Sequence, residues 1–250
     1  MKSCSIMKRE IVQYFSAPYF YVLMTIFLVL SGYFFYTDTV LFNLMNFRGT
    51  TSLTRGLWAY YFNDLRFVFI LIMPLITMRV FAEEKKLGTI ELITTYPLKD
   101  IEILTGKVLA CLVVFVFMLS LTFINVIIIG IIWDFGEIAS VMSGYLCIFF
   151  LGFALISCGV FVSSLTDNQI VASLGTMGLF TLFWFLTWNE MIVSEEGLKL
   201  LKRLSLFDRT FDFFRGIINS KDVVYFMLFS FYFLFLSLQS LGSRSWKGMK

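Results

Sequence analysis

The sequence predicts an all-α membrane protein of six transmembrane helices, and three observations lead to this. Hydrophobic residues make up 59% of the 250 residues, and the mean hydropathy is +0.85, which is more apolar than a water-soluble domain of this size. Uncharged stretches long enough to cross a bilayer recur along the chain. Each backbone donor and acceptor in lipid needs a partner within its own segment, so these stretches are expected to be helices.

Composition argues against several other classes of protein. The net charge of +3 and the pI of about 8.6 are too mild to indicate nucleic-acid binding. Histidine is absent, which removes the usual zinc ligand and the histidine of Ser-His and Cys-His dyads, so neither a metal site nor an intramembrane hydrolase is expected. The four cysteines show no CxxC spacing and are expected to pack as small hydrophobic residues.

The first expected element is an interfacial helix at the N-terminus. Its apolar face would carry Met7, Ile11, Tyr14 and Phe15, which recur at helical spacing. Pro18 then stands where a new helix begins. The six spans are expected, within a single domain covering residues 1–250, at residues 19–36, 60–80, 106–133, 139–164, 168–188 and 222–243.

Charged residues bear on both the spans and the topology. Asp64 and Arg66 are expected to flank the outer end of the second span, and no Asp, Glu or Arg is expected inside the membrane. With both termini assigned to the cytoplasm, eleven Lys and Arg residues lie inside and nine outside. The positive-inside rule therefore favours cytoplasmic termini in a bacterial inner-membrane protein.

The loop before the last span is not typical of a linker. Leu198, Leu201 and Leu204 recur at helical spacing, and Phe207, Phe211 and Phe214 follow in the same manner. We expect this extracytoplasmic segment to be re-entrant or to form a surface helix.

The segment from Met78 to Val108, between the second and third spans, combines charge with apolar periodicity. A helix from Glu84 to Thr95 would place Glu84, Gly88, Glu91 and Thr95 in one polar stripe, with apolar residues around the rest. Glycine inside a helix costs about 1 kcal/mol relative to alanine, so Gly88 would indicate close approach of a neighbour. Two interpretations are open: an ordinary interfacial helix, or a helix that docks on a protein partner.

This segment resembles the coupling-helix signature of ABC-2 type permeases, in particular the branch with gliding-motility-associated permeases. The residues that carry the resemblance are Met78-Arg79, Phe81-Ala82-Glu83-Glu84-Lys85-Lys86-Leu87-Gly88-Thr89-Ile90-Glu91-Leu92, Pro97 and Gly106-Lys107. Weaker similarity extends along the chain to Lys8-Arg9-Glu10, Ser163 to Gln169, Arg215 to Ile218 and Asp222 to Tyr225.

The resemblance implies a permease subunit of an exporter, paired with a second, identical or related permease and with cytoplasmic ABC ATPase subunits. It assigns the ATPase contacts to Glu83, Glu84, Lys86, Gly88, Thr89, Glu91 and Leu92, with Pro97 ending the coupling helix. The chain lacks a GxxxxGK[ST] phosphate-binding loop. It is therefore expected to be no enzyme and to hold no cofactor, with ATP bound by the partner.

Two other functions stay open at this point. An ion-coupled secondary transporter would place acidic residues or arginine inside its spans. A non-transporting scaffold or remodelling subunit would keep the coupling helix, so only a transport assay separates it from a permease. The cargo is not evident, because phenylalanine-rich spans suit both an apolar cargo and lipid-facing helices.

Overall fold

The computed structural model describes residues 2–46, 53–88, 99–132, 138–185 and 205–247, and the only regular secondary structure in these ranges is α-helix. The helices, in chain order, are α1 (Lys2–Ser16), α2 (Pro18–Asn46), α3 (Leu53–Thr77), α4 (Arg79–Lys86), α6 (Asp100–Leu121), α7 (Phe123–Ile132), α8 (Ile138–Leu165), α9 (Gln169–Phe185), α11 (Thr210–Phe214) and α12 (Ser220–Lys247). The predicted all-α class is confirmed for these residues.

Five helical segments in the described ranges are long and apolar enough to cross a membrane. They are Pro18–Leu44, Gly56–Lys86, Asp100–Ile131, Ile138–Leu165 and Ser220–Gly242. The predicted fifth span, residues 168–188, corresponds to α9, of which 17 residues are described. A multi-pass membrane protein is thus confirmed, and the sixth crossing stays a prediction.

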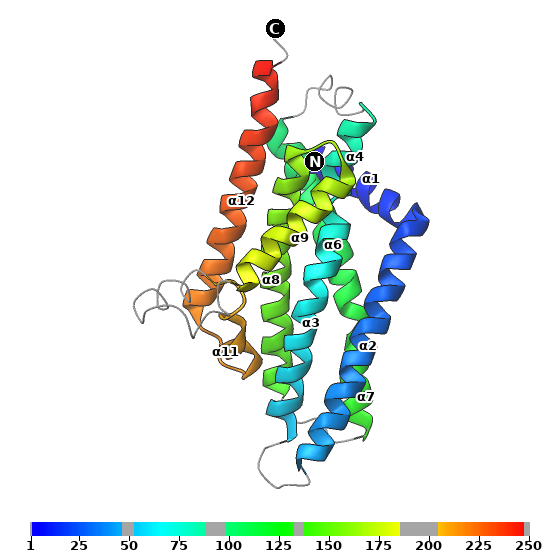
Figure 1. Cartoon of the computed structure of the whole chain (residues 1–250), viewed down its shortest axis with the longest axis vertical. Helices are drawn as coiled ribbons and strands as arrows, with labels where there is room; N and C mark the ends of the chain where they lie inside the picture. The colour runs from blue at the N-terminus through cyan, green and yellow to red at the C-terminus, as the bar shows by residue number, and fades with distance from the viewer. Residues whose placement is uncertain (1, 47–52, 89–98, 133–137, 186–204, 248–250) are drawn as a thin grey trace.

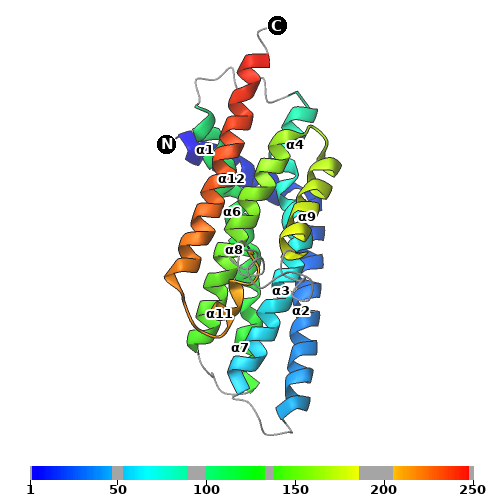
Figure 2. The ribbon, with the colours of Figure 1, turned by 60° about the vertical axis from the view of Figure 1, so that its left-hand side comes forward.

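Helix α8 lies at the centre of the bundle, where it contacts α3, α4, α6, α9, α11 and α12. Its glycines permit this close packing: a Cβ atom on Gly144 would lie 2.0 Å from the Phe62 ring, and one on Gly159 would lie 2.2 Å from Thr77 Oγ1. Figures 1 and 2 show α1 crossing the end of the bundle that also holds α4 and the C-terminal end of α12.

The interruption between α3 and α4 follows from a proline. Pro74 has no backbone N–H and its ring crowds the preceding turn, so the regular pattern of α3 weakens there. Met78 N–H donates to the Pro74 carbonyl at 2.9 Å, which closes a turn before α4 begins. The two helices consequently form one nearly continuous apolar segment with a defined joint.

Charged residues, which were not expected inside the spans, lie within two of the candidate membrane-crossing helices. Helix α2 continues past the predicted end of its span and contains Asp38, and α3 begins before Asp64 and Arg66 rather than between them. The side chains of Asp38 and Arg66 are each 6% exposed. The helices continue through these residues, so they extend beyond the ends that the charged residues had predicted.

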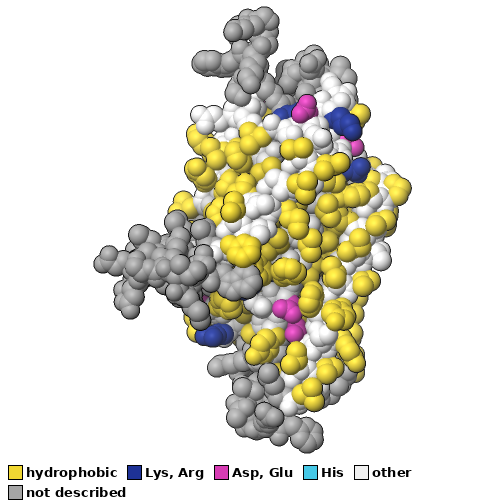
Figure 3. Space-filling model, in the orientation of Figure 1, with side chains coloured by type: hydrophobic (Ala, Val, Ile, Leu, Met, Phe, Trp, Pro, Cys, Tyr) yellow, Lys and Arg dark blue, Asp and Glu magenta, His cyan; other side chains and the backbone are white. Residues whose placement is uncertain are grey.

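The segment before α12 is packed into the bundle where the structure describes it. Leu198, Leu201 and Leu204 lie outside the described residues. Phe207 and Phe214 are buried, as their spacing predicted, but Phe211 is 43% exposed. Helix α11 packs against α3 and α8. The face in Figure 3 is largely hydrophobic, with charged side chains gathered near α1 and α4 and in a second band lower on the bundle.

Candidate functional site at the junction of α1, α4 and α6

Lys107 of α6 is the centre of a buried group of charges. Its side chain is only 2% exposed, and its ammonium lies 2.8 Å from Glu84 Oε1 of α4 and 3.2 Å from Glu10 Oε1 of α1. It also donates to the Val80 carbonyl at 2.8 Å. A buried ammonium is tolerated when it is paired and hydrogen-bonded in this way.

Arg9 completes the group from the solvent side. Its guanidinium lies 3.1 Å from Glu10 and 3.2 Å from Glu84, and its side chain is 57% exposed. Two cations therefore share two carboxylates across three helices. We call Arg9, Glu10, Glu84 and Lys107 the junction cluster. It holds no net formal charge, so it fixes the relative positions of α1, α4 and α6 without an uncompensated ion.

Close packing brings α1 and α6 together beside the junction cluster. A Cβ atom on Gly106 would lie 2.9 Å from Ile6 Cβ and from the Ser3 carbonyl, so only glycine permits this approach. At the other end of α1, the Tyr14 hydroxyl donates to the Ile76 carbonyl at 2.9 Å. Burial raises the pKa of the Tyr14 phenol well above its usual value. The phenol therefore stays protonated and remains a donor to α3.

Ser163 of α8 holds the first turn of α4. Its hydroxyl accepts hydrogen bonds from Phe81 N–H at 3.1 Å and Ala82 N–H at 3.2 Å, and donates to the Met78 carbonyl at 3.0 Å. The first N–H groups of a helix have no partner within it, so this hydroxyl satisfies two of them. Lys85 also donates to the Ser164 carbonyl. Helix α4 is thus attached to α1, α6 and α8 together.

The junction cluster joins three helices through its charges. The described residues contain no group of three His, Cys, Asp or Glu side chains able to hold a metal ion. Each charge of the junction cluster is engaged with another helix. Any displacement of α4 must therefore move α1 and α6 or break buried ion pairs.

A family model described as "ABC-2 family transporter protein" matches residues 4–204. The chain belongs to the ABC-2 transporter family. A search of curated proteins found no significant match. Membership in the ABC-2 family identifies the chain as a membrane permease subunit and implies association with ABC ATPase subunits. The matched range includes α1, α4, α6, α8 and the whole junction cluster.

The structure corrects the predicted helix of this ABC-2 permease at residues 84–95. Helix α4 ends at Lys86, and Gly88 follows with φ = +68°. Leu87 N–H donates to the Glu83 carbonyl and Gly88 N–H to the Lys85 carbonyl, as in a helix C-terminus that uses a left-handed glycine. No heavy atom lies near a Cβ built on Gly88. The positive φ explains Gly88 as a helix-ending glycine, which is a different role from the mid-helix position that was predicted.

The predicted contact residues separate into three groups. Glu84 joins the junction cluster, whereas Glu83 pairs with Arg79 at 3.3 Å and Arg79 stacks on the Tyr19 ring. Lys86 and Gly88 are exposed at the end of α4. Thr89, Glu91, Leu92 and Pro97 lie outside the described residues, so their role stays a prediction.

Sequence reasoning did not assign a site role to Lys107, Glu10 or Arg9. The available signal was the lysine itself, since Lys107 stands among apolar residues near the start of a predicted span. Pairing between residues 97 positions apart in sequence cannot be read from local spacing.

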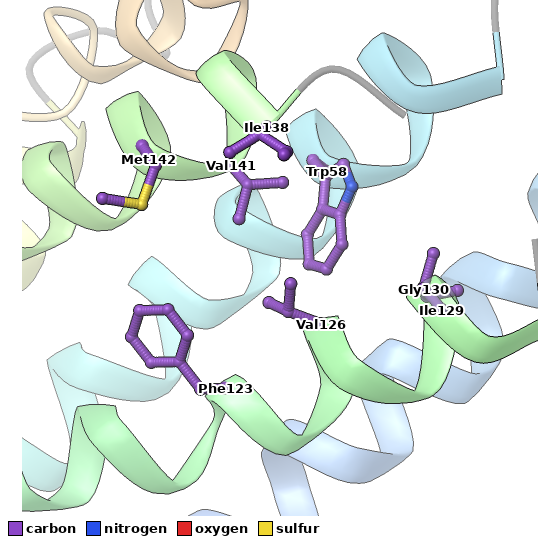
Figure 4. A pocket seen from close by; sticks show the side chains of 8 residues that line it. All are labelled: Trp58, Phe123, Val126, Ile129, Gly130, Ile138, Val141 and Met142. Carbon is purple, nitrogen blue, oxygen red and sulfur yellow. The ribbon is translucent and has the colours of Figure 1, made fainter. Parts of the chain in front are cut away.

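A separate cavity of about 200 Å³ lies near the opposite end of the ABC-2 permease. Figure 4 shows Trp58 of α3, residues of α7 including Phe123 and Val126, and Ile138, Val141 and Met142 of α8 around it. Its lining is apolar apart from the indole nitrogen. A cavity of this kind suits an apolar group but contains little to orient a polar one.

Proposed function

We propose that this ABC-2 permease is the membrane subunit of an ATP-driven exporter, and that separate ATPase subunits contact the end of α4 and residues 89–98. The observation that carries the proposal is the junction cluster, in which Lys107 links Glu84 of α4 to Glu10 of α1. A force applied at α4 would reach the bundle through buried ion pairs. ATP would be bound and hydrolysed by the partner, and this chain would supply no catalytic group.

The exposed end of α4 supplies the docking surface in this proposal. Leu87 is 66% exposed directly after the helix, beside the exposed Lys86 and Gly88. In this proposal Leu87 supplies the apolar side chain that the ATPase buries, and the charged residues around it form the rim of the contact. The common placement of α1, α4 and the end of α12 supports a shared cytoplasmic side for both termini. A second permease subunit, identical or related, would complete the transporter.

The test is purification of the tagged chain in mild detergent with quantitative mass spectrometry of the proteins that accompany it. Wild type is expected to retain an ABC ATPase, and Leu87→Glu to reduce its recovery at least about tenfold by placing a charge in the contact. Ile218→Glu is the matched control, because Ile218 is 54% exposed. It lies just before the N-terminal end of α12, whereas the C-terminal end of α12 is the one near α4. A folded wild-type chain that retains no ATPase would overturn the proposal in favour of a scaffold.

One observation favours a second candidate, ion-coupled transport. Asp38 is buried in α2, and its Oδ2 atom has no hydrogen-bond partner among the described residues. Buried carboxylates within membrane helices often carry protons or cations. If Asp38→Asn abolished transport of an identified cargo while ATP hydrolysis continued unchanged, the second candidate would gain support over the first.

A further inference from the structure

Arg66 connects α3 to the segment that precedes α12. Its guanidinium donates to the Phe207 carbonyl at 2.8 Å and to Thr210 Oγ1 at 3.0 Å. The same group stacks over the rings of Phe211, at 4.6 Å, and Trp184, at 5.4 Å. A planar guanidinium donates hydrogen bonds in its own plane while its flat faces lie on aromatic rings, and an ammonium has no such face.

The segment that Arg66 holds is buried. Leu206, Phe207, Phe213 and Phe214 are each 0–2% exposed, and Phe214 stacks on Phe62 of α3. Ser143 of α8 holds the other end of the segment by donating to the Phe213 carbonyl at 2.8 Å. We call residues 205–214 the α11 segment. It lies on α3 and α8, toward the end of the bundle away from α1 and α4 (Figure 1).

Arg66 and the junction cluster are attached to the same length of helix. Glu84 lies 18 positions after Arg66, which corresponds to roughly 27 Å at 1.5 Å per residue. The joint at Met78 is closed by its hydrogen bond to Pro74 and by Ser163. The hydrogen bond from Met78 to Pro74 keeps the joint closed, and we expect a displacement of α4 to reach α3 through it.

We propose that Arg66 is a positioning residue that couples movement of α4 to opening of the α11 segment at the outer end of the permease. This inference rests on the proposed function, since it assumes that ATPase subunits move α4. When α3 shifts, the guanidinium carries the Phe207 carbonyl and Thr210 with it. Ser143 anchors the same segment to α8, which meets α4 only through the contacts of Ser163 and Ser164, whereas α3 continues directly into α4.

The test compares the two residues that hold the α11 segment, Arg66 on α3 and Ser143 on α8. Arg66→Met removes the hydrogen bonds from α3 to the segment and leaves the Phe62–Phe214 stacking in place, whereas Ser143→Ala removes one hydrogen bond from α8 to the same segment. The probe is Leu206→Cys, a fully buried position on the α11 segment. It is placed in a Cys4→Ser background because Cys4 is exposed while Cys111, Cys147 and Cys158 are buried. Labelling by a membrane-impermeant maleimide is measured in lipid nanodiscs with the co-purified ATPase.

The expected result is a labelling rate for Leu206→Cys that rises about tenfold when ATP and vanadate trap the ATPase, as for opening of a buried segment. Arg66→Met is expected to abolish that rise while ATP hydrolysis continues. Arg66→Lys, which keeps the charge and one donor, is expected to restore part of the rise. Ser143→Ala is expected to keep it.

Two results would overturn the inference. The first is that Arg66→Met labels like the parent after trapping. The second is that Ser143→Ala loses the response as completely as Arg66→Met, which would reduce Arg66 to a packing role. Failure of the proposed function is recognised separately, because no ATPase then accompanies the chain. If hydrolysis is present and Leu206→Cys never responds to nucleotide, only the inference about Arg66 fails.

Discussion

The ammonium of Lys107 lies 2.8 Å from a carboxylate oxygen of Glu84, and the lysine side chain is 2% exposed. Glu84 lies in α4, among the residues that the resemblance assigns to ATPase contact, and Lys107 lies in α6, which follows them. An ion pair shielded from water is screened little by salt and resists separation. It is therefore a suitable mechanical link between a cytoplasmic helix and the bundle.

Lys107→Met is expected to destabilise the protein by about 3–5 kcal/mol, because it leaves two carboxylates buried with only Arg9 to compensate them. Thermal unfolding in detergent, followed by size-exclusion chromatography, measures the change. Lys86→Met at an exposed position is the control. In the double variant Lys107→Met, Glu84→Met, part of the loss should return; strict additivity would contradict a direct pair.

Ser163→Ala is expected to cost about 1–3 kcal/mol, since it removes the partner of two buried N–H groups and one carbonyl. Ser173→Ala serves as the matched change, because that hydroxyl donates only within its own helix to Ile170. The same melting assay compares them. Equal melting temperatures for the two variants would show that Ser163 does not secure α4.

Gly88→Ala is expected to cost about 1–2 kcal/mol, because φ = +68° is unfavourable for residues with a Cβ atom. Gly88→Asn should cost less, since asparagine enters this region more readily. Recovery of the ATPase with each variant should follow the same order if the end of α4 is the docking surface. The reverse order, alanine tolerated and asparagine not, would contradict a left-handed role for Gly88.

Tyr14 gives a pH-dependent prediction. Burial raises the pKa of the Tyr14 phenol in the folded chain above the ordinary phenol value of about 10. The phenol therefore still donates to the Ile76 carbonyl at pH values where a free phenol is ionised. Above that value the unfolded chain loses the proton and the folded chain keeps it, so this residue's contribution to stability falls as pH rises. Tyr14→Phe should therefore lose less stability than wild type between pH 8 and 11. Parallel losses in pH-dependent melting would contradict this.

Part of the site could be predicted from local sequence. The placement of Glu84 near the end of a span followed from charge and apolar spacing, and Pro18 correctly marked the start of α2. Gly88 was misread because helical periodicity continues through it, and a glycine that ends a helix has the same neighbours in sequence as one inside it. The backbone angle alone distinguishes the two cases.

The sequence by itself determined that this is an all-α membrane protein and where its charged segment between spans lies, because hydropathy and helical period are local properties that lipid enforces. The tertiary structure alone decided which charges meet. Lys107 pairs with Glu10, which is 97 positions away in the sequence, and Arg66 donates to the Phe207 carbonyl, which is 141 positions away. Such contacts depend on how α1, α8 and the α11 segment pack, and burial in the packed bundle is what makes each isolated charge require a partner.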